Sequence, residues 1–154
     1  MAILKDYDGS AYFELKLIRR VEVDNGDPSC YDHWFEVDFS MLTPTVQFKL
    51  SKTERILQME VQSLLNYLHS FETKEFIPLY EFYPEAQIFD LKFTTLDGLD
   101  EGIVEFECWR PVGVYTSGAV TGYFEGIRYC VDNAAMLLFY QQLLQEAAAC
   151  KTER

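Results

Sequence analysis

Hydrophobic and polar residues alternate with a period of two in the first third of the chain. The alternation covers residues 12–23 and 33–42, and it returns more briefly from Val46 to Leu50. This pattern is typical of β-strands with one face in the core and the other in water. We therefore predict three strands here. The last two should form an antiparallel hairpin through the turn at Pro44.

The loop between the first two strands carries strong turn signals. Asn25-Gly26 accommodates positive φ angles, and Pro28 lacks a backbone donor, so we expect the first strand to end at this loop.

The period changes between residues 51 and 71, which predicts an α-helix. Ser51 and Glu54 have the spacing of a capping box, which would start the helix early. Alternatively, residues 55–58 form a short strand and the helix begins at Met59, which is the start we favour. The apolar residues at helical spacing are Val61, Leu64, Leu65 and Leu68.

Alternation returns in residues 88–93 and 103–109, after a segment that Pro78 and Pro84 mark as a loop. The turn pair Asp97-Gly98 predicts that these two strands form a hairpin. The side chains that we expect to face the core are Phe89, Leu91, Phe93, Val104, Phe106 and Cys108.

The segment from Pro111 to Gly126 is rich in glycine. We predict two short strands in it, residues 112–115 and 120–124, with a turn at Ser117-Gly118. Its glycines fit neither a phosphate-binding loop nor a dinucleotide fingerprint, because they do not lead from a strand into a helix.

The chain closes with a second helical pattern. Asp132 is placed to act as the N-cap of a helix that runs through Ala149. The apolar stripe comprises Met136, Phe139, Tyr140, Leu143, Leu144 and Ala147. With no linker or internal repeat, residues 1–154 are expected to form a single α+β domain. The architecture predicted is an antiparallel sheet system of about seven strands, covered by one mid-chain and one C-terminal helix.

Net charge narrows the choice of partners. Lys and Arg number 13 against 25 Asp and Glu, a net charge of −12. Such a chain repels phosphate backbones and anionic lipids, so nucleic acid and membranes are not expected partners. A basic protein is favoured instead, unless the acidity serves only solubility. No apolar run is long enough for a membrane span or a signal peptide, which favours the cytoplasm.

Catalytic and metal-binding chemistry has little support in the sequence. The four cysteines are scattered without a Cys-x-x-Cys pair, so we expect free thiols rather than disulfides or zinc. His33 lies beside Asp32, but neighbouring strand residues point to opposite faces. His69 is better placed to interact with the end of its helix. We expect no catalytic residues, metal or cofactor. An enzyme using Glu105 and Glu107 as a carboxylate pair is a third-ranked hypothesis.

Acidic residues gather in two groups that are candidates for partner binding. One group belongs to the first loop and the outward side of the second strand, and the other lies within residues 81–107, where Lys92 is the only base. We expect them to surround an aromatic anchor, Trp34 or Trp109, although a tryptophan is more often a core residue. The contact residues predicted are Asp24, Asp27, Asp32, Trp34, Glu36, Asp38, Glu101, Glu105 and Glu107.

The order of these signals resembles one family, the WapI-type immunity proteins of bacterial polymorphic toxin systems. The resemblance covers residues 13–146, although residues 111–126 are longer than the family pattern and Tyr67 replaces an expected tryptophan. The stretches that carry it are residues 13–18 (FELKLI), 32–37 (DHWFEV), 57–68 (LQMEVQSLLNYL), 83–85 (YPE) and 129–132 (YCVD).

The resemblance implies a protein that inhibits a cognate toxin domain by direct binding, without catalytic residues of its own. Together with the charge, it favours a basic, nuclease-like toxin as the partner. The alternative is a non-enzymatic structural or adaptor protein that self-associates through a sheet edge or the C-terminal helix.

Overall fold

The computed structural model describes residues 1–24, 31–45, 47–96, 102–116, 119–150 and 152–153. Within these ranges it describes the backbone alone at residues 24, 31–32, 50–53, 112–116, 119–123 and 152–153.

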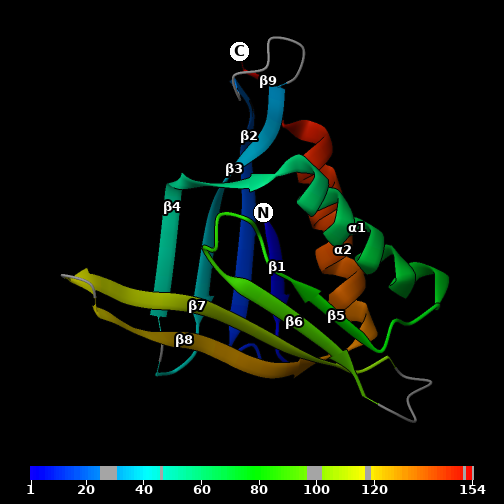
Figure 1. Cartoon of the computed structure of the whole chain (residues 1–154). Helices are drawn as coiled ribbons and strands as arrows, with labels where there is room; N and C mark the ends of the chain where they lie inside the picture. Colours follow the sequence, from blue (N-terminus) through cyan, green and yellow to red (C-terminus); the bar gives the residue numbers. More distant parts are fainter. Residues whose placement is uncertain (25–30, 46, 97–101, 117–118, 151, 154) are drawn as a thin grey trace.

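The elements follow the order β1–β4, α1, β5–β8, α2 and β9 (Figure 1). The helices are α1 (Gln58–Thr73) and α2 (Asn133–Ala149). The strands are β1 (Ala2–Lys5), β2 (Tyr12–Asp24), β3 (Tyr31–Leu42), β4 (Gln47–Leu57), β5 (Leu79–Phe82), β6 (Asp90–Thr95), β7 (Val104–Thr116), β8 (Ala119–Val131) and β9 (Thr152–Glu153).

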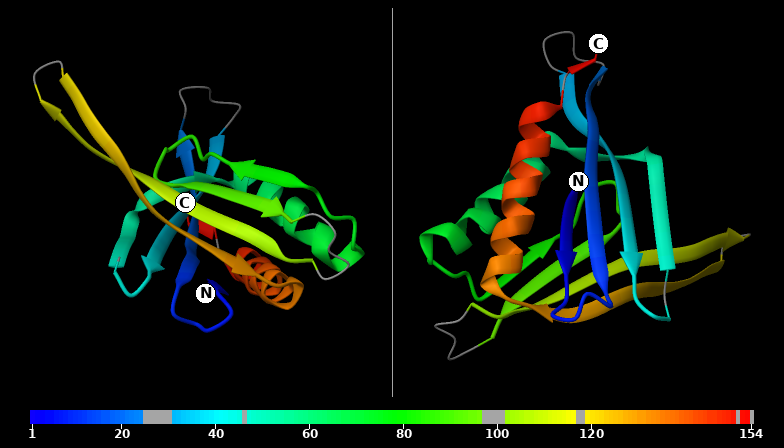
Figure 2. Two further views of the ribbon diagram at one scale, coloured as in Figure 1. Left: turned by 90° about the horizontal axis from the view of Figure 1, so that it is seen from below. Right: turned by 180° about the vertical axis from the view of Figure 1, so that it is seen from behind.

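These strands form two sheets. Sheet A has the order β1-β2-β3-β4, with β9 beside β2, and sheet B has the order β5-β6-β7-β8. All neighbours are antiparallel except β2 and β9, which are parallel. The strands of sheet B run across those of sheet A, and both helices lie along one side of the pair (Figures 1 and 2). The predicted α+β class and the two helices are confirmed.

The inner faces of the two sheets enclose an aromatic core. Phe13 of β2 lies 5.5 Å from Phe106 of β7 between ring centroids, and Phe39 of β3 lies 4.6 Å from Phe89. Phe139 of α2 approaches Phe13 at 6.2 Å. The core agrees with the predicted alternation, because the hydrophobic residues that it placed inward are almost completely buried, among them Phe13, Leu15, Leu17, Phe35, Val37, Phe39, Val104 and Phe106.

The helix boundaries follow local hydrogen bonds. The α1 helix starts directly after strand β4, where the Leu57 backbone N–H donates to Glu60 Oε2 at 2.9 Å. The favoured later start is therefore confirmed. The alternative start at Ser51 is wrong, because that residue belongs to β4. At α2, the Ala135 N–H donates to Asp132 Oδ1 at 2.7 Å, as expected of an N-cap.

The segment from Pro111 to Gly126 differs from the prediction of two separate short strands. β7 and β8 form one continuous ladder, from Val104↔Val131 to Thr116↔Ala119. The pairing of β7 with β6 extends only as far as the pair Asp90↔Trp109, where β6 begins. Beyond it, β7 has an open edge at Pro111. A proline is tolerated on such an edge because no neighbouring strand needs its N–H. The far ends of β7 and β8 extend away from the rest of the molecule (Figure 2).

Candidate protein-binding site

The first predicted acidic group belongs to sheet A. Asp24 and Asp32 lie in the paired ends of β2 and β3, although their side chains are not described, and Asp27 lies outside the described residues. Trp34, Glu36 and Asp38 alternate with core residues and therefore lie on the outer face of this sheet.

Glu36 is a buried member of an ion-pair network. Its side chain accepts from Arg19 Nε at 2.7 Å and Nη2 at 3.1 Å, and Arg55 Nη2 lies 3.5 Å away. The residue is only 8% exposed. Arg19 hydrogen bonding and the two positive charges hold the pKa of this carboxyl below its usual value. Glu36 therefore forms ion pairs within sheet A and is not exposed for contact with a partner, unlike the prediction.

The surroundings of Glu36 are basic rather than acidic. Asp38 pairs across the strands with Lys16, and Ser40 pairs with Lys49. Trp34 is half-buried, between Val21 and Leu57 in the ladder, and its indole N–H has no hydrogen-bond partner in the described part of the chain. The described outer face of sheet A therefore does not form an acidic patch.

The second predicted group belongs to sheet B. Glu105 and Glu107 point to its outer face, as predicted, because Val104, Phe106 and Cys108 are fully buried. Glu105 accepts from Arg128 Nη2 at 2.7 Å, and Glu107 accepts from Trp109 Nε1 at 2.8 Å. Glu101 lies outside the described residues. Because the inner faces of the sheets meet, the described members of the two acidic groups lie on opposite outer faces and do not adjoin.

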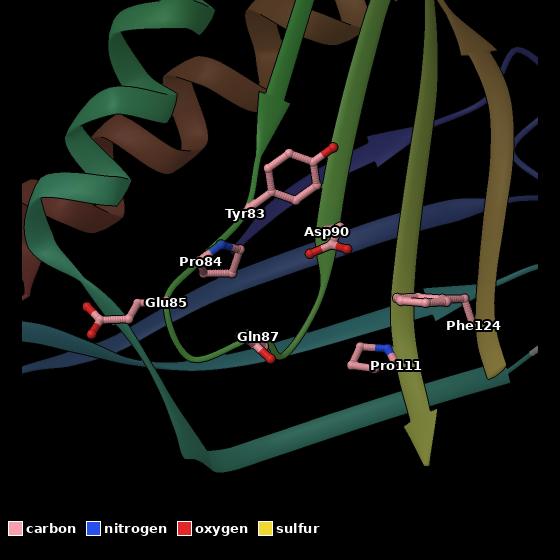
Figure 3. Close-up of a pocket in the computed structure, with 7 residues that line it drawn as sticks. All are labelled: Tyr83, Pro84, Glu85, Gln87, Asp90, Pro111 and Phe124. Carbon is pink, nitrogen blue, oxygen red and sulfur yellow. The ribbon is translucent and has the colours of Figure 1, made fainter. Parts of the chain in front are cut away.

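A hollow of about 400 Å³ opens on the outer face of sheet B, next to Glu107 and Trp109 in the ladder. We call it the Tyr83–Phe124 hollow, after the two aromatic residues that flank it (Figure 3). Tyr83 follows β5, Phe124 belongs to β8, and both are strongly exposed, at 61% and 62%. The lining residues are Tyr83, Pro84, Glu85, Gln87, Asp90, Pro111 and Phe124.

The loop on one side of the hollow is held by specific contacts. The Gln87 N–H donates to the Pro84 carbonyl at 2.8 Å, which closes a tight turn with Gln87 at a φ of 53°. The Glu85 N–H donates to Glu60 Oε1 at 2.7 Å. Because Glu60 also binds the Leu57 N–H, one carboxylate joins the start of α1 to this loop. The next residues, Ile88 and Phe89, are buried and anchor the loop to the core.

The carboxylates at the hollow have no basic partner within the described part of the chain. Asp90 is half-buried, and burial raises its pKa above the usual value. Partial burial, followed by the nearby Glu81 and Asp90, raises the pKa of Tyr83. The bases of sheet B contact other acids: Arg128 binds Glu105, Lys92 lies 4.0 Å from Glu107, and Arg110 binds Glu125 at 2.6 Å.

Within the described residues, no histidine or cysteine lines this hollow. His69 lies on α1, 3.0 Å from Glu72 and 3.2 Å from the Tyr140 hydroxyl. Cys108, Cys130 and Cys150 are free, and Cys108 is fully buried, which raises its thiol pKa. Among the residues that the structure describes, no three His, Cys, Asp or Glu side chains form a group able to hold a metal.

The sequence pattern pointed to the acidity of residues 81–107 but not to the hollow. Tyr83 lies in a loop, Asp90 starts β6, and Phe124 follows more than 30 residues later. Only the β6-β7-β8 pairing brings these three residues together. Comparison of the chain with protein-family models, curated proteins and solved structures found no match. None of the helices in the described residues has the length and apolar character required to cross a membrane.

Proposed function

We propose that this protein is an immunity-type protein that binds a basic, nuclease-like toxin domain and neutralises it in the cytoplasm by direct contact. The observation that supports the proposal is the Tyr83–Phe124 hollow, where two exposed aromatic rings lie beside carboxylates that have no basic partner among the described residues. Interfaces are often anchored by aromatic residues, and acidic surfaces favour basic partners. The net charge of −12 adds a long-range attraction for a positively charged partner.

The chemistry of the hollow supports binding over catalysis. The residues described as lining it include no histidine, cysteine, serine or threonine. The Tyr83 hydroxyl has a raised pKa and is therefore protonated at neutral pH, which makes it a poor nucleophile. The pair Glu105 and Glu107 lies on the same face, but each carboxylate already binds a neighbouring donor.

The proposal can be tested by co-expression with toxin domains encoded beside its gene. We expect cells to survive only when the protein is present, and we expect a stoichiometric complex on gel filtration. Cells that stop growing despite full expression of the protein, without any complex, would refute the proposal.

Self-association is a second candidate function, supported by the exposed side of α2. Leu138 and Leu144 are 52% and 44% exposed there. Glu146 is the only charged residue in the whole helix. An uncharged helix face on an acidic protein is suited to contact with a second copy, as in a structural or adaptor protein. Light scattering that finds a stable homo-oligomer without affinity for basic proteins would favour this function over inhibition.

A further inference from the structure

We propose that the Tyr83–Phe124 hollow binds an arginine side chain presented by the partner protein. This inference rests on the proposed function, because it identifies the chemical group that the binding surface takes. The hollow lies between two exposed aromatic residues, with Asp90 between them (Figure 3). A guanidinium is the flat cation that stacks on aromatic rings and pairs with a carboxylate at the same time.

The aromatic residues provide the first part of the argument. Tyr83 and Phe124 are 61% and 62% exposed, although each is large and apolar enough to be buried in a core. Pro84 and Pro111 complete the apolar walls. Exposed ring faces attract cations through their quadrupole, and they attract arginine more often than lysine.

Asp90 provides the second part. β6 places it on the outer face, because its neighbours Phe89 and Leu91 are both fully buried. Burial of the Asp90 carboxylate raises its pKa, and no ion pair compensates for it within the described residues. A cation bound in the hollow would stabilise this charge.

The basic residues of sheet B provide the third part, since none of them is directed to the hollow. Arg110, which is nearest in sequence to Pro111, binds Glu125 and stacks on Phe48 of sheet A, with Cζ 3.2 Å from the ring centroid. Arg128 and Lys92 contact Glu105 and Glu107. These three described bases of sheet B are therefore engaged elsewhere, and the proposal assigns the cation to another molecule.

The size and openness of the hollow fit a side chain rather than a cofactor. Its volume of about 400 Å³ is near the lower end for small-molecule sites, and it is open to solvent. An arginine projecting from a protein surface can enter such a hollow, and the backbone around it can rest on the exposed strands.

The test uses the full chain and three pentapeptides, Gly-Gly-X-Gly-Gly, in which X is arginine, lysine or citrulline. Citrulline has the shape of arginine without its charge. Nuclear magnetic resonance titration should show saturable binding of the arginine peptide, with a dissociation constant on the order of millimolar. The shifted amides should cluster at Tyr83, Asp90 and Phe124. The lysine peptide should bind more weakly, and the citrulline peptide should not bind.

Matched variants locate the effect. Asp90→Asn and Phe124→Ala should each weaken binding of the arginine peptide by about fivefold. Glu75→Gln removes one exposed negative charge just beyond the C-terminal end of α1, and Tyr7→Ala removes another exposed ring, so both variants should bind the arginine peptide like the original chain. Equal weakening by Asp90→Asn and Glu75→Gln would overturn the inference, as would citrulline binding or shifts away from the hollow. Lysine binding as tight as arginine binding would overturn the assignment of a guanidinium.

The inference and the proposed function can fail separately. If the arginine peptide does not bind but the neighbouring toxin domain is still captured, the inference is wrong and the proposed function holds. If the peptide binds in the hollow but no toxin domain is captured or neutralised, the proposed function is wrong.

Discussion

Asp90 and Glu36 are half-buried or buried acids whose environments have opposite electrostatic effects. Asp90 has no ion pair among the described residues to offset its burial, so its pKa is raised. Glu36 has Arg19 and Arg55, so its pKa is lowered. The ionised Glu36 carboxylate therefore stabilises the folded state, whereas the ionised Asp90 carboxylate destabilises it. A residue that a protein keeps despite a cost to stability is a better candidate for binding than one that stabilises the fold.

Asp90→Asn should make the protein slightly more stable at neutral pH, by about 0.5 kcal/mol. Because the folded pKa lies above the ordinary value of 3.8, the folded state keeps its proton longer than the unfolded state. The contribution of Asp90 to stability should therefore become less favourable as pH rises through this window. Chemical denaturation at several pH values measures the difference between variant and original, which should be small below the ordinary pKa and larger at neutral pH. A variant less stable at neutral pH would contradict the electrostatic assignment.

Glu36→Gln should destabilise the fold by about 1 to 2 kcal/mol at neutral pH, because it weakens the bonds to Arg19 and Arg55. The pKa of Glu36 is below its ordinary value of 4.5, so its stabilising effect is complete above that pH and is lost as pH falls. The gap between variant and original should close in acid. Glu75→Gln serves as the control, since that exposed residue should not change stability. If Glu36→Gln abolished partner binding without loss of stability, Glu36 would be a contact residue after all.

At the scale of elements, period-two alternation predicted most strands because half of each strand is buried. Phe35, Val37 and Phe39 are inward, and each is at most 1% exposed. β1 was missed because four residues show too little alternation, although Ala2 and Leu4 are fully buried. β5 was missed because Pro78 and Pro84 predicted a loop there. Only two of its residues, Tyr80 and Phe82, face inward, which is too few for a clear alternation.

The binding surface could be predicted only in part. Glu105 and Glu107 were placed on the correct face by alternation, but their ion pairs with Arg128 depend on the register of β7 against β8. The register also determines that Phe124 lies opposite Pro111. Alternation gives the face of a strand, whereas neighbours across a sheet depend on long-range pairing that no local pattern specifies.

Glu60 links α1 to the loop at the hollow, so its removal should affect both elements. Glu60→Ala should destabilise the fold by about 1 kcal/mol, as expected for the loss of a helix cap, and should free the Leu57 and Glu85 N–H groups. Hydrogen exchange of the Glu85 amide should accelerate. Gln58→Ala, an exposed position in the first turn of the same helix, is the control. Unchanged exchange at Glu85 would show that the loop is held without Glu60.

At the scale of the whole molecule, charge is unevenly distributed. The outer face of sheet A carries Arg19 and Arg55 around Glu36, and Lys16 opposite Asp38. At the Tyr83–Phe124 hollow, by contrast, Glu85 and Asp90 have no ion pair among the described residues. The surface thus offers different kinds of contact: a charge-balanced sheet face, an acidic aromatic hollow and the uncharged side of α2. Of these surfaces, the acidic hollow is expected to attract a basic partner more strongly than the charge-balanced face of sheet A.

Salt should separate the two proposed functions, because one depends on opposite charges and the other on an uncharged helix face. Association with a basic toxin domain should slow about tenfold or more between about 0.05 M and about 0.5 M salt. Self-association through α2 should instead strengthen, because salt screens the repulsion between copies that each carry a net charge of −12. Stopped-flow mixing measures the first effect and sedimentation measures the second. Leu138→Glu should abolish self-association while leaving toxin binding intact, since Leu138 lies on α2 rather than on sheet B. A toxin complex that forms equally fast at both salt concentrations would contradict electrostatic recognition of a basic partner.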